Sequence, residues 1–182
     1  MQLVAFLRGI NVGGRVAKKE QLLKAFASAG CRNVETFRQS GNVIFETNTT
    51  NLGAITGRIE DQLRKTLGYD VPVFIRTFDS LQKLVEKGSR NRVDEGTSLL
   101  VTLLLSSTPN PILSLPLTIP KSAAEIVSAS GSEVFSLTHG GGEGGLPNPF
   151  LESKLKVKTT TRNMNVIREI VQKYGRNPAR TP

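Results

Sequence analysis

Two short glycine-containing segments concentrate the side chains that could bind an anion. The first, RGINVGGR, follows an apolar run, and the second, RQSGN, lies in a short polar connection. Guanidinium and amide groups, together with backbone N–H groups that glycine leaves accessible, suit phosphate or carboxylate oxygens. Turn formation by the glycines and hairpin capping by Asn42 are the simpler explanations for single residues. The predicted ligand-binding residues are Arg8, Asn11, Gly13, Gly14 and Arg15 in the first segment and Gln39, Ser40, Gly41 and Asn42 in the second.

The hydrophobic pattern predicts that these two segments meet. An apolar strand over 3–8 precedes the first segment, and strands in NVETF and NVIFET flank the second, with Ser40 and Gly41 as a tight connection. Amphipathic helices over 18–29 and 52–67 and a strand in VPVFIRT complete the order β-α-β-β-α-β, which is ferredoxin-like. In that topology the C-terminal end of the first strand and the turn between the second and third strands lie at the same edge of the sheet.

The rest of the chain predicts a second half of similar element order. It contains a helix over 80–87, strands over 98–105, 123–128 and 132–138, a poor, proline-broken helix over 109–120, and a helix over 164–174. We therefore predict an α+β fold of two ferredoxin-like halves packed in one compact unit. The predicted boundaries are 1–78 for the N-terminal half, 79–97 for a helix and linker, 98–175 for the C-terminal half and 176–182 for a disordered basic tail.

A third polar segment, TTTRNMN, precedes the last predicted helix. Thr161 or Asn163 suits the N-cap of that helix. A helix N-terminus with Arg162 beside it would also form a second anion-binding element, so all three residues join the predicted site. Capping alone is the simpler explanation.

The motifs LRGINVGG, NVETFRQSGNVIFE, FLESKL and TTRNMN resemble those of a bacterial family catalogued as domain of unknown function sixteen-ninety-seven. The resemblance runs over about residues 2–174 and implies two ferredoxin-like halves, with no established activity. Arg38 stands where relatives usually have an apolar residue, so we leave it out of the predicted site. Glu143, Gly144 and Gly145 replace a basic run, and Met164 replaces a tryptophan. If the family site uses those side chains, the resemblance implies a different ligand or a lost activity here.

The composition narrows the classes of partner. A formal net charge of +9 and an isoelectric point near 10.1 favour anionic partners, although most basic residues suit solvated helix faces. Cys31, the single cysteine, has no second cysteine for an internal disulfide. The longest apolar run is too short to span a bilayer. We expect a soluble cytoplasmic protein that does not enter membranes, and we predict no particular oligomeric state.

Familiar catalytic and cofactor motifs are missing from the sequence. His139 is the only histidine, and a surface or packing role suits it better than a metal or general-base role. We find no cysteine–histidine cluster, no carboxylate set with metal spacing, no dinucleotide fingerprint and no phosphate-binding loop motif. Ser40 has no evident base beside it. We therefore predict no metal and no cofactor.

Two functions remain. The first is binding of a phosphorylated or other anionic small molecule, with or without catalysis, between the halves at the edge where the two segments meet. The alternative is RNA binding across a sheet face, which requires exposed aromatic residues on the first and third strands. Phe6 and Phe45 occupy those strands, but both strands are apolar on each face and aromatic residues are few. We favour the small molecule and expect nucleic acid to bind only through nonspecific charge. A purely structural role has no positive signature.

Overall fold

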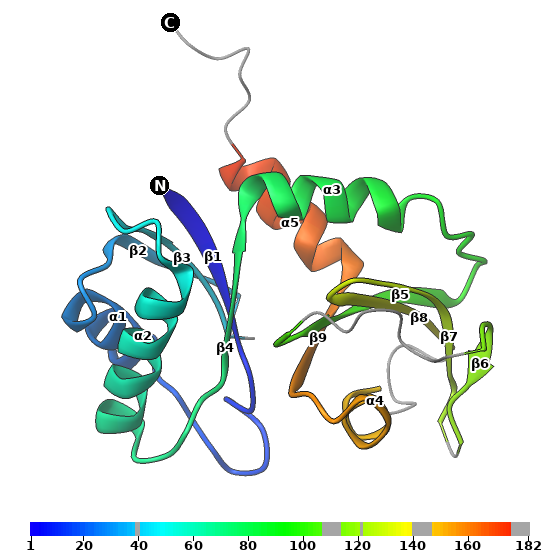
Figure 1. Cartoon of the computed structure of the whole chain (residues 1–182), viewed down its shortest axis with the longest axis horizontal. Helices are drawn as coiled ribbons and strands as arrows, with labels where there is room; N and C mark the ends of the chain where they lie inside the picture. The colour runs from blue at the N-terminus through cyan, green and yellow to red at the C-terminus, as the bar shows by residue number, and fades with distance from the viewer. Residues whose placement is uncertain (39–40, 107–113, 121, 140–146, 176–182) are drawn as a thin grey trace, which may run out of the picture. The chain divides into compact units, whose positions relative to one another are not determined.

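The computed structural model describes residues 1–38, 41–106, 114–120, 122–139 and 147–175 (Figure 1). Within these ranges the chain has a mixed α+β fold with two antiparallel sheets and five helices, which confirms the α+β part of the predicted fold class. The chain divides into two compact units, Met1–Phe78 and Asp79–Pro182. No helix of the described part is long and apolar enough to cross a membrane.

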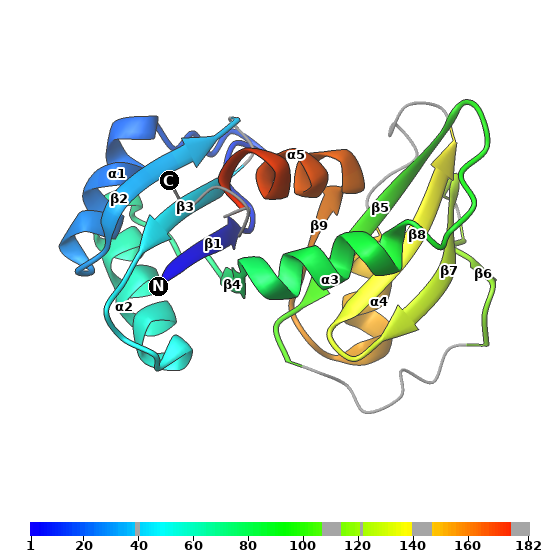
Figure 2. The same cartoon turned by 90° about the horizontal axis from the view of Figure 1, so that it is seen from above.

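The N-terminal unit is a four-stranded antiparallel sheet covered on one face by two neighbouring helices, α1 and α2 (Figure 2). Its strands lie in the order β2-β3-β1-β4. The central position of β1 suits its apolar sequence, because residues 3–7 are buried on both faces. The elements are β1 (Gln2–Leu7), α1 (Lys19–Ser28), β2 (Arg32–Phe37), β3 (Asn42–Glu46), α2 (Leu52–Leu67) and β4 (Val73–Thr77), in the predicted order.

The helix α2 shows how the local sequence fixes its boundaries. Asn51 is the N-cap, and its side-chain Oδ1 accepts a hydrogen bond of 3.0 Å from the backbone N–H of Ala54. Gly68 ends the helix with a left-handed φ of 81°, which glycine adopts without steric penalty. Ile55, Ile59 and Leu63 recur at helical spacing and are fully buried against the sheet.

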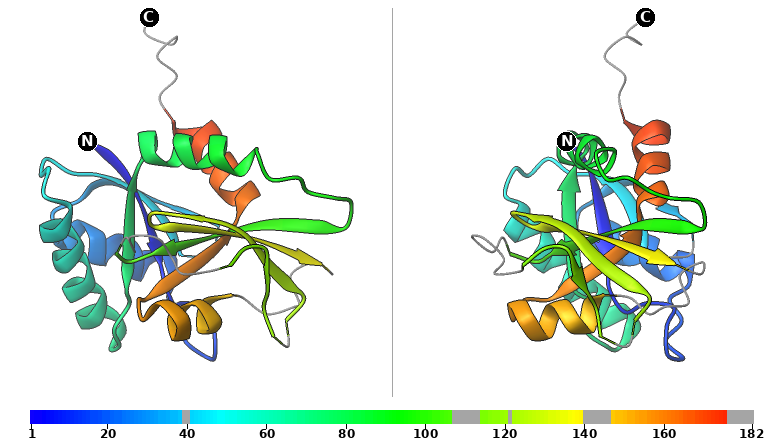
Figure 3. Two further views of the ribbon diagram at one scale, coloured as in Figure 1. Left: turned by 45° about the vertical axis from the view of Figure 1, so that its right-hand side comes forward. Right: turned by 90° about the vertical axis from the view of Figure 1, so that its right-hand side faces the viewer.

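The C-terminal unit is a five-stranded antiparallel sheet in the order β6-β7-β8-β5-β9. Figure 3 shows α4 on one face of this sheet and α3 and α5 on the other. Leu151 of α4 packs into an apolar cluster with Leu104 and Val134. The elements are α3 (Phe78–Gly88), β5 (Thr97–Leu104), β6 (Leu117–Thr118), β7 (Ala124–Ser130), β8 (Glu133–His139), α4 (Asn148–Leu155), β9 (Thr159–Asn163) and α5 (Met164–Tyr174).

The predicted element order for the C-terminal half is wrong in two places. Residues 114–120 contain no helix, because Pro116 and Pro120 lack the N–H groups that a helix needs. Leu117–Thr118 instead forms the strand β6, which pairs with β7. Helix α4 and strand β9 were not predicted. The sequence of β9 is rich in threonine and predicts a polar segment before the last helix, but β-branched threonine also suits a strand. The segments 107–113, 140–146 and 176–182, which include Glu143, Gly144, Gly145 and the predicted tail, lie outside the described residues.

Candidate functional site

The two predicted motifs are in direct contact at Gly41. Its φ is +72°, and a Cβ at this position would lie 2.9 Å from Ile10 Cδ1 and 3.2 Å from Leu7 Cβ. The backbone N–H of Leu7 also donates a 2.7 Å hydrogen bond to the carbonyl oxygen of Gly41. A side chain at position 41 would therefore push the loop after β1 away from the β2–β3 hairpin, and glycine permits the contact.

The loop from Arg8 to Lys18 is closed by its own amide side chain. Asn11 has a left-handed φ of 54°, which asparagine tolerates better than most residues. Its Oδ1 accepts a 2.9 Å hydrogen bond from the backbone N–H of Ala17. Gly13 and Gly14, also with positive φ, make the turn between these two residues. The loop thus returns to the start of α1 in a fixed conformation.

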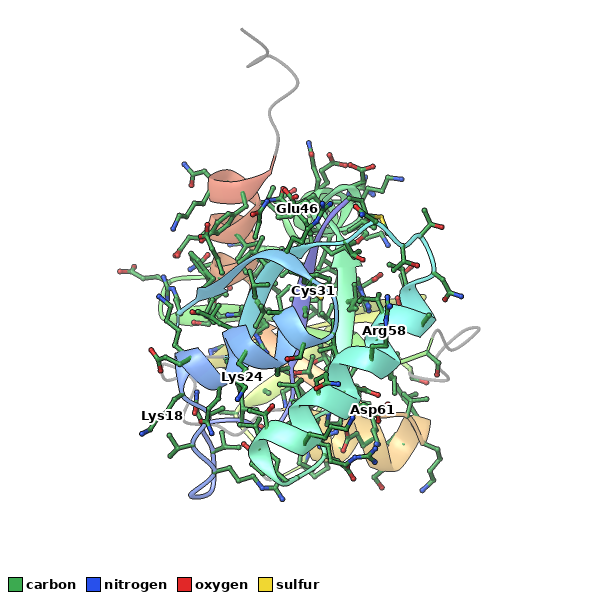
Figure 4. The ribbon with its side chains drawn as sticks, turned by 90° about the vertical axis from the view of Figure 1, so that its left-hand side faces the viewer. Lys18, Lys24, Cys31, Glu46, Arg58 and Asp61 are labelled. Carbon is green, nitrogen blue, oxygen red and sulfur yellow. The ribbon has the colours of Figure 1, made fainter. Side chains whose placement is uncertain are left out.

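The start of α1 presents a positive helix end beside this loop. The backbone N–H of Lys18 donates to Gln21 Oε1 at 2.9 Å, which fixes the first turn. The N–H groups of Lys19 and Glu20 have no acceptor within the helix because they belong to its first turn. Figure 4 shows Lys18 beside the start of α1, with Lys24 further along the same helix.

The loop, the helix start and the hairpin line a cavity of about 440 Å³ that is open to solvent on one side. Three of the lining side chains are cationic (Lys18, Lys19 and Arg38), and one is acidic (Glu20). Such a volume is within the usual range for sites of small molecules. The remaining lining residues are Asn11, Val16, Ala17, Leu22, Thr36, Gly41 and Asn42. Of the predicted site residues, the cavity therefore brings together Asn11, Gly41 and Asn42.

The hairpin side of the cavity is formed by the ends of β2 and β3. Arg38 has a φ of +55°, and its guanidinium carbon lies 5.8 Å from the centroid of the Phe37 ring. Asn42 is fully buried, and its Nδ2 donates to the carbonyl oxygen of Phe37 at 3.1 Å. Asn42 thus braces the hairpin while it contributes to the cavity wall.

The two arginines of the first motif do not line this cavity. Arg8 is half-buried, its backbone N–H donates to the carbonyl oxygen of Pro72 at 3.0 Å, and burial lowers the pKa of its guanidinium. The guanidinium carbon of Arg15 lies 4.9 Å from the centroid of the Tyr69 ring, a cation–π contact. The predicted residues Gln39 and Ser40 lie outside the described part of the chain.

The third motif belongs to the C-terminal unit, where it forms β9 and the start of α5. Arg162 lies in β9 rather than at a helix start, and only 9% of its surface is exposed. It donates to Thr160 Oγ1 at 2.9 Å and to the carbonyl oxygen of Thr161 at 2.8 Å, and burial lowers its pKa to about 10. Asn163 is confirmed as the N-cap of α5, because its Oδ1 accepts a 2.9 Å hydrogen bond from the backbone N–H of Asn165.

Thr161 takes part in a buried chain of hydroxyl groups. Its Oγ1 donates to Asn148 Oδ1 at 2.6 Å and lies 2.7 Å from Thr102 Oγ1. A hydroxyl has one proton to donate. Thr102 is therefore the donor to Thr161, and the chain links β5, β9 and α4 within the C-terminal unit.

The cationic residues of the cavity were missed by the sequence analysis. The sequence pattern assigns Lys18 and Lys19 to a solvated helix face. Arg38 is not part of the predicted site, because family members usually have an apolar residue at that position. The available signal was the start of the first helix, which the pattern places next to the glycine-rich loop.

His139 lies at the end of β8, where its Nδ1 is 3.3 Å from Thr97 Oγ1. In the described ranges no three His, Cys, Asp or Glu side chains are grouped to hold a metal ion.

Comparison with known proteins gives a family and a fold. The family model DUF1697, described as a protein of unknown function, matches residues 1–135. The chain belongs to this family. Its structure is similar to that of the conserved bacterial protein SP0830 from Streptococcus pneumoniae, with a TM-score of 0.60 and 16% sequence identity, over 94% of this chain and 97% of that one. No curated protein matches the chain significantly.

Proposed function

We propose that this protein binds a small anionic molecule in the cavity between the loop after β1, the start of α1 and the β2–β3 hairpin. The observation that carries the proposal is the set of three cations, Lys18, Lys19 and Arg38, around a cavity with a single carboxylate, Glu20. The N–H groups of Lys19 and Glu20, which have no acceptor within α1, add positive potential at the same place. Asn11 and Asn42 also line the cavity, and their hydrogen bonds to Ala17 and Phe37 brace its wall.

The geometry of the loop supports binding rather than a transient surface contact. The hydrogen bond from Ala17 to Asn11 and the packing of Ile10 against Gly41 hold the cavity wall in place without a ligand. A preformed wall reduces the entropy lost when a ligand binds. The proposal concerns binding only, since none of the described lining residues pairs a nucleophile with a base.

The order of elements and strands in the N-terminal unit supports our assignment of this half to the ferredoxin-like folds. The same topology prompted the alternative of RNA binding on a sheet face. That alternative needs exposed rings on β1 and β3. Phe6 and Phe45 are both fully buried, and Phe45 packs edge to face on Phe26 at 5.4 Å between centroids. These rings are therefore not available for stacking on bases.

The proposal is tested by titration of phosphorylated metabolites and inorganic phosphate into wild-type protein and two charge variants, with binding measured by calorimetry. Arg38→Gln removes a lining cation, and Lys24→Gln removes an equal charge from the same unit at a residue that does not line the cavity. A lost charge-assisted hydrogen bond costs about 1.5–3 kcal/mol, so Arg38→Gln should weaken binding roughly tenfold or more. Lys24→Gln should bind nearly as wild type.

Equal weakening by the two variants would mean that the anion responds to overall charge and would refute the cavity as the site. Absence of binding by every phosphorylated probe at low salt would refute the proposal as a whole. Thermal unfolding of each variant serves as the control for folding.

A further inference from the structure

The wall of the cavity has an apolar side that an inorganic anion would not use. Val16 lines the cavity and is 70% exposed, the highest value among the large apolar residues exposed in the described chain. Behind it, Ala17 and Leu22 also line the cavity and are almost completely buried. An exposed valine on its own is ordinary. Here Val16 lies with the buried residues Ala17 and Leu22 in the wall of a cavity that is also lined by cations.

The position of Val16 is fixed by its neighbours. The backbone N–H of Ala17, the next residue, is bound to Asn11 Oδ1 at 2.9 Å, and Lys18 is held by Gln21. These two hydrogen bonds hold the backbone that follows Val16, whose side chain is exposed. Burial of its exposed side chain by a ligand would stabilise the complex through the hydrophobic effect.

The size of the cavity also exceeds what a free oxyanion needs. A volume of about 440 Å³ is in the range of sites that hold organic ligands, which begins at about 300 Å³. Phosphate or sulfate, with five heavy atoms, would fill a small part of that space. The rest would be occupied by another portion of the ligand or by water.

The lining charge indicates which anion fits. Lys18, Lys19 and Arg38 against Glu20 give three positive charges and one negative charge, an excess of two positive charges. A phosphate monoester carries about −1.5 to −2 at pH 7, because its second pKa is about 6. A monoester therefore matches the formal charge better than a monocarboxylate does.

We infer that the ligand is a phosphate monoester with an apolar or aromatic body, whose phosphate is bound by the lining cations Lys18, Lys19 and Arg38 and whose body covers the exposed side chain of Val16. This inference rests on the proposed function, since it assigns a ligand class to the same cavity. It assigns Val16 a role in selecting the organic part of the ligand.

The test compares three probes by isothermal titration calorimetry: phenyl phosphate, glycerol phosphate and inorganic phosphate. Phenyl phosphate should bind about tenfold or more tightly than the other two, because only its ring can cover the apolar side of the cavity. Val16→Ser should weaken phenyl phosphate about fivefold, consistent with partial burial of one valine side chain. The same change should leave inorganic phosphate unaffected.

A matched control is available in the same loop. Val12 is also exposed, at 59%, but does not line the cavity. Val12→Ser should therefore leave the affinity of phenyl phosphate unchanged.

The outcomes separate the inference from the proposed function. Equal affinity for phenyl phosphate and glycerol phosphate, or equal effects of Val16→Ser and Val12→Ser, would overturn the apolar subsite while anion binding stands. If Arg38→Gln binds all three probes as wild type does, or if none of the probes binds at all, the proposed cavity site fails and the inference fails with it.

Discussion

Replacement of Gly41 by alanine tests the contact that joins the two motifs. The new Cβ would lie 2.9 and 3.0 Å from the Cδ1 and Cγ1 atoms of Ile10, so that side chain would have to move. The left-handed backbone costs an L-residue about 1–2 kcal/mol, and overpacking of a well-filled site costs about 1–3 kcal/mol. We expect Gly41→Ala to lower the free energy of unfolding of the N-terminal unit by about 2–5 kcal/mol.

Urea unfolding followed by circular dichroism measures this loss, and Gly68→Ala is the matched control. Gly68 also has a positive φ, +81°, but a Cβ there would meet nothing within 4 Å. Gly68→Ala should therefore show only the backbone part, about 1–2 kcal/mol. The difference between the two variants gives the steric part at Gly41.

A second background identifies the atoms responsible. In Ile10→Ala, which is itself destabilised, the added methyl group at position 41 has more space. Gly41→Ala should then cost about 1 kcal/mol less than it does in the wild-type background, a coupling that a double-mutant cycle measures directly. Additive effects of the two changes, or a Gly41→Ala variant no less stable than Gly68→Ala, would refute the contact as described.

Three further predictions follow from single groups. Burial raises the pKa of the Cys31 thiol to about 11 despite the nearby charge of Arg58. Since the thiolate is the reactive form, a disulfide reagent at pH 8 should react with Cys31 of the folded protein roughly 100-fold more slowly than with Cys31 of the unfolded chain. Equal rates would contradict this prediction. Thr161→Val removes the donor to Asn148 and should lower the free energy of unfolding by about 1–3 kcal/mol in urea titrations. Asn51→Ala removes the N-cap of α2 and should cost about 1 kcal/mol, with Asn51→Asp near wild type as the control.

Where the sequence pattern was strong, it predicted the fold well. Helix α2 has a capping asparagine, three apolar residues at helical spacing and a terminal glycine, so its bounds follow from the sequence. Strand β1 is apolar from Leu3 to Leu7, which predicts a central position. In the C-terminal half the signals conflict. A strand of threonines carries no apolar alternation, and α4 has a short, weakly amphipathic sequence, so neither was predicted.

The sequence predicts that the two motifs meet, and it names three of the residues that line the cavity, Asn11, Gly41 and Asn42. The convergence of the two motifs follows from topology, and the contact between Ile10 and Gly41 agrees with it. The direction of each side chain depends on the loop conformation, which the sequence does not specify. Arg15 thus turns to Tyr69, while the cations of the cavity come from the helix start and from Arg38.

The central position of the first strand in each sheet affects how the protein is made. β1 lies between β3 and β4, and β5 lies between β8 and β9. A ribosome releases β1 first, yet β4, which covers its open edge, is among the last parts of that unit to emerge. One edge of the apolar β1 must therefore wait unpaired on the nascent chain after β3 has emerged, and one edge of β5 must wait in the same way for β9. Such unpaired apolar strands are prone to aggregate and are typical binding sites for chaperones.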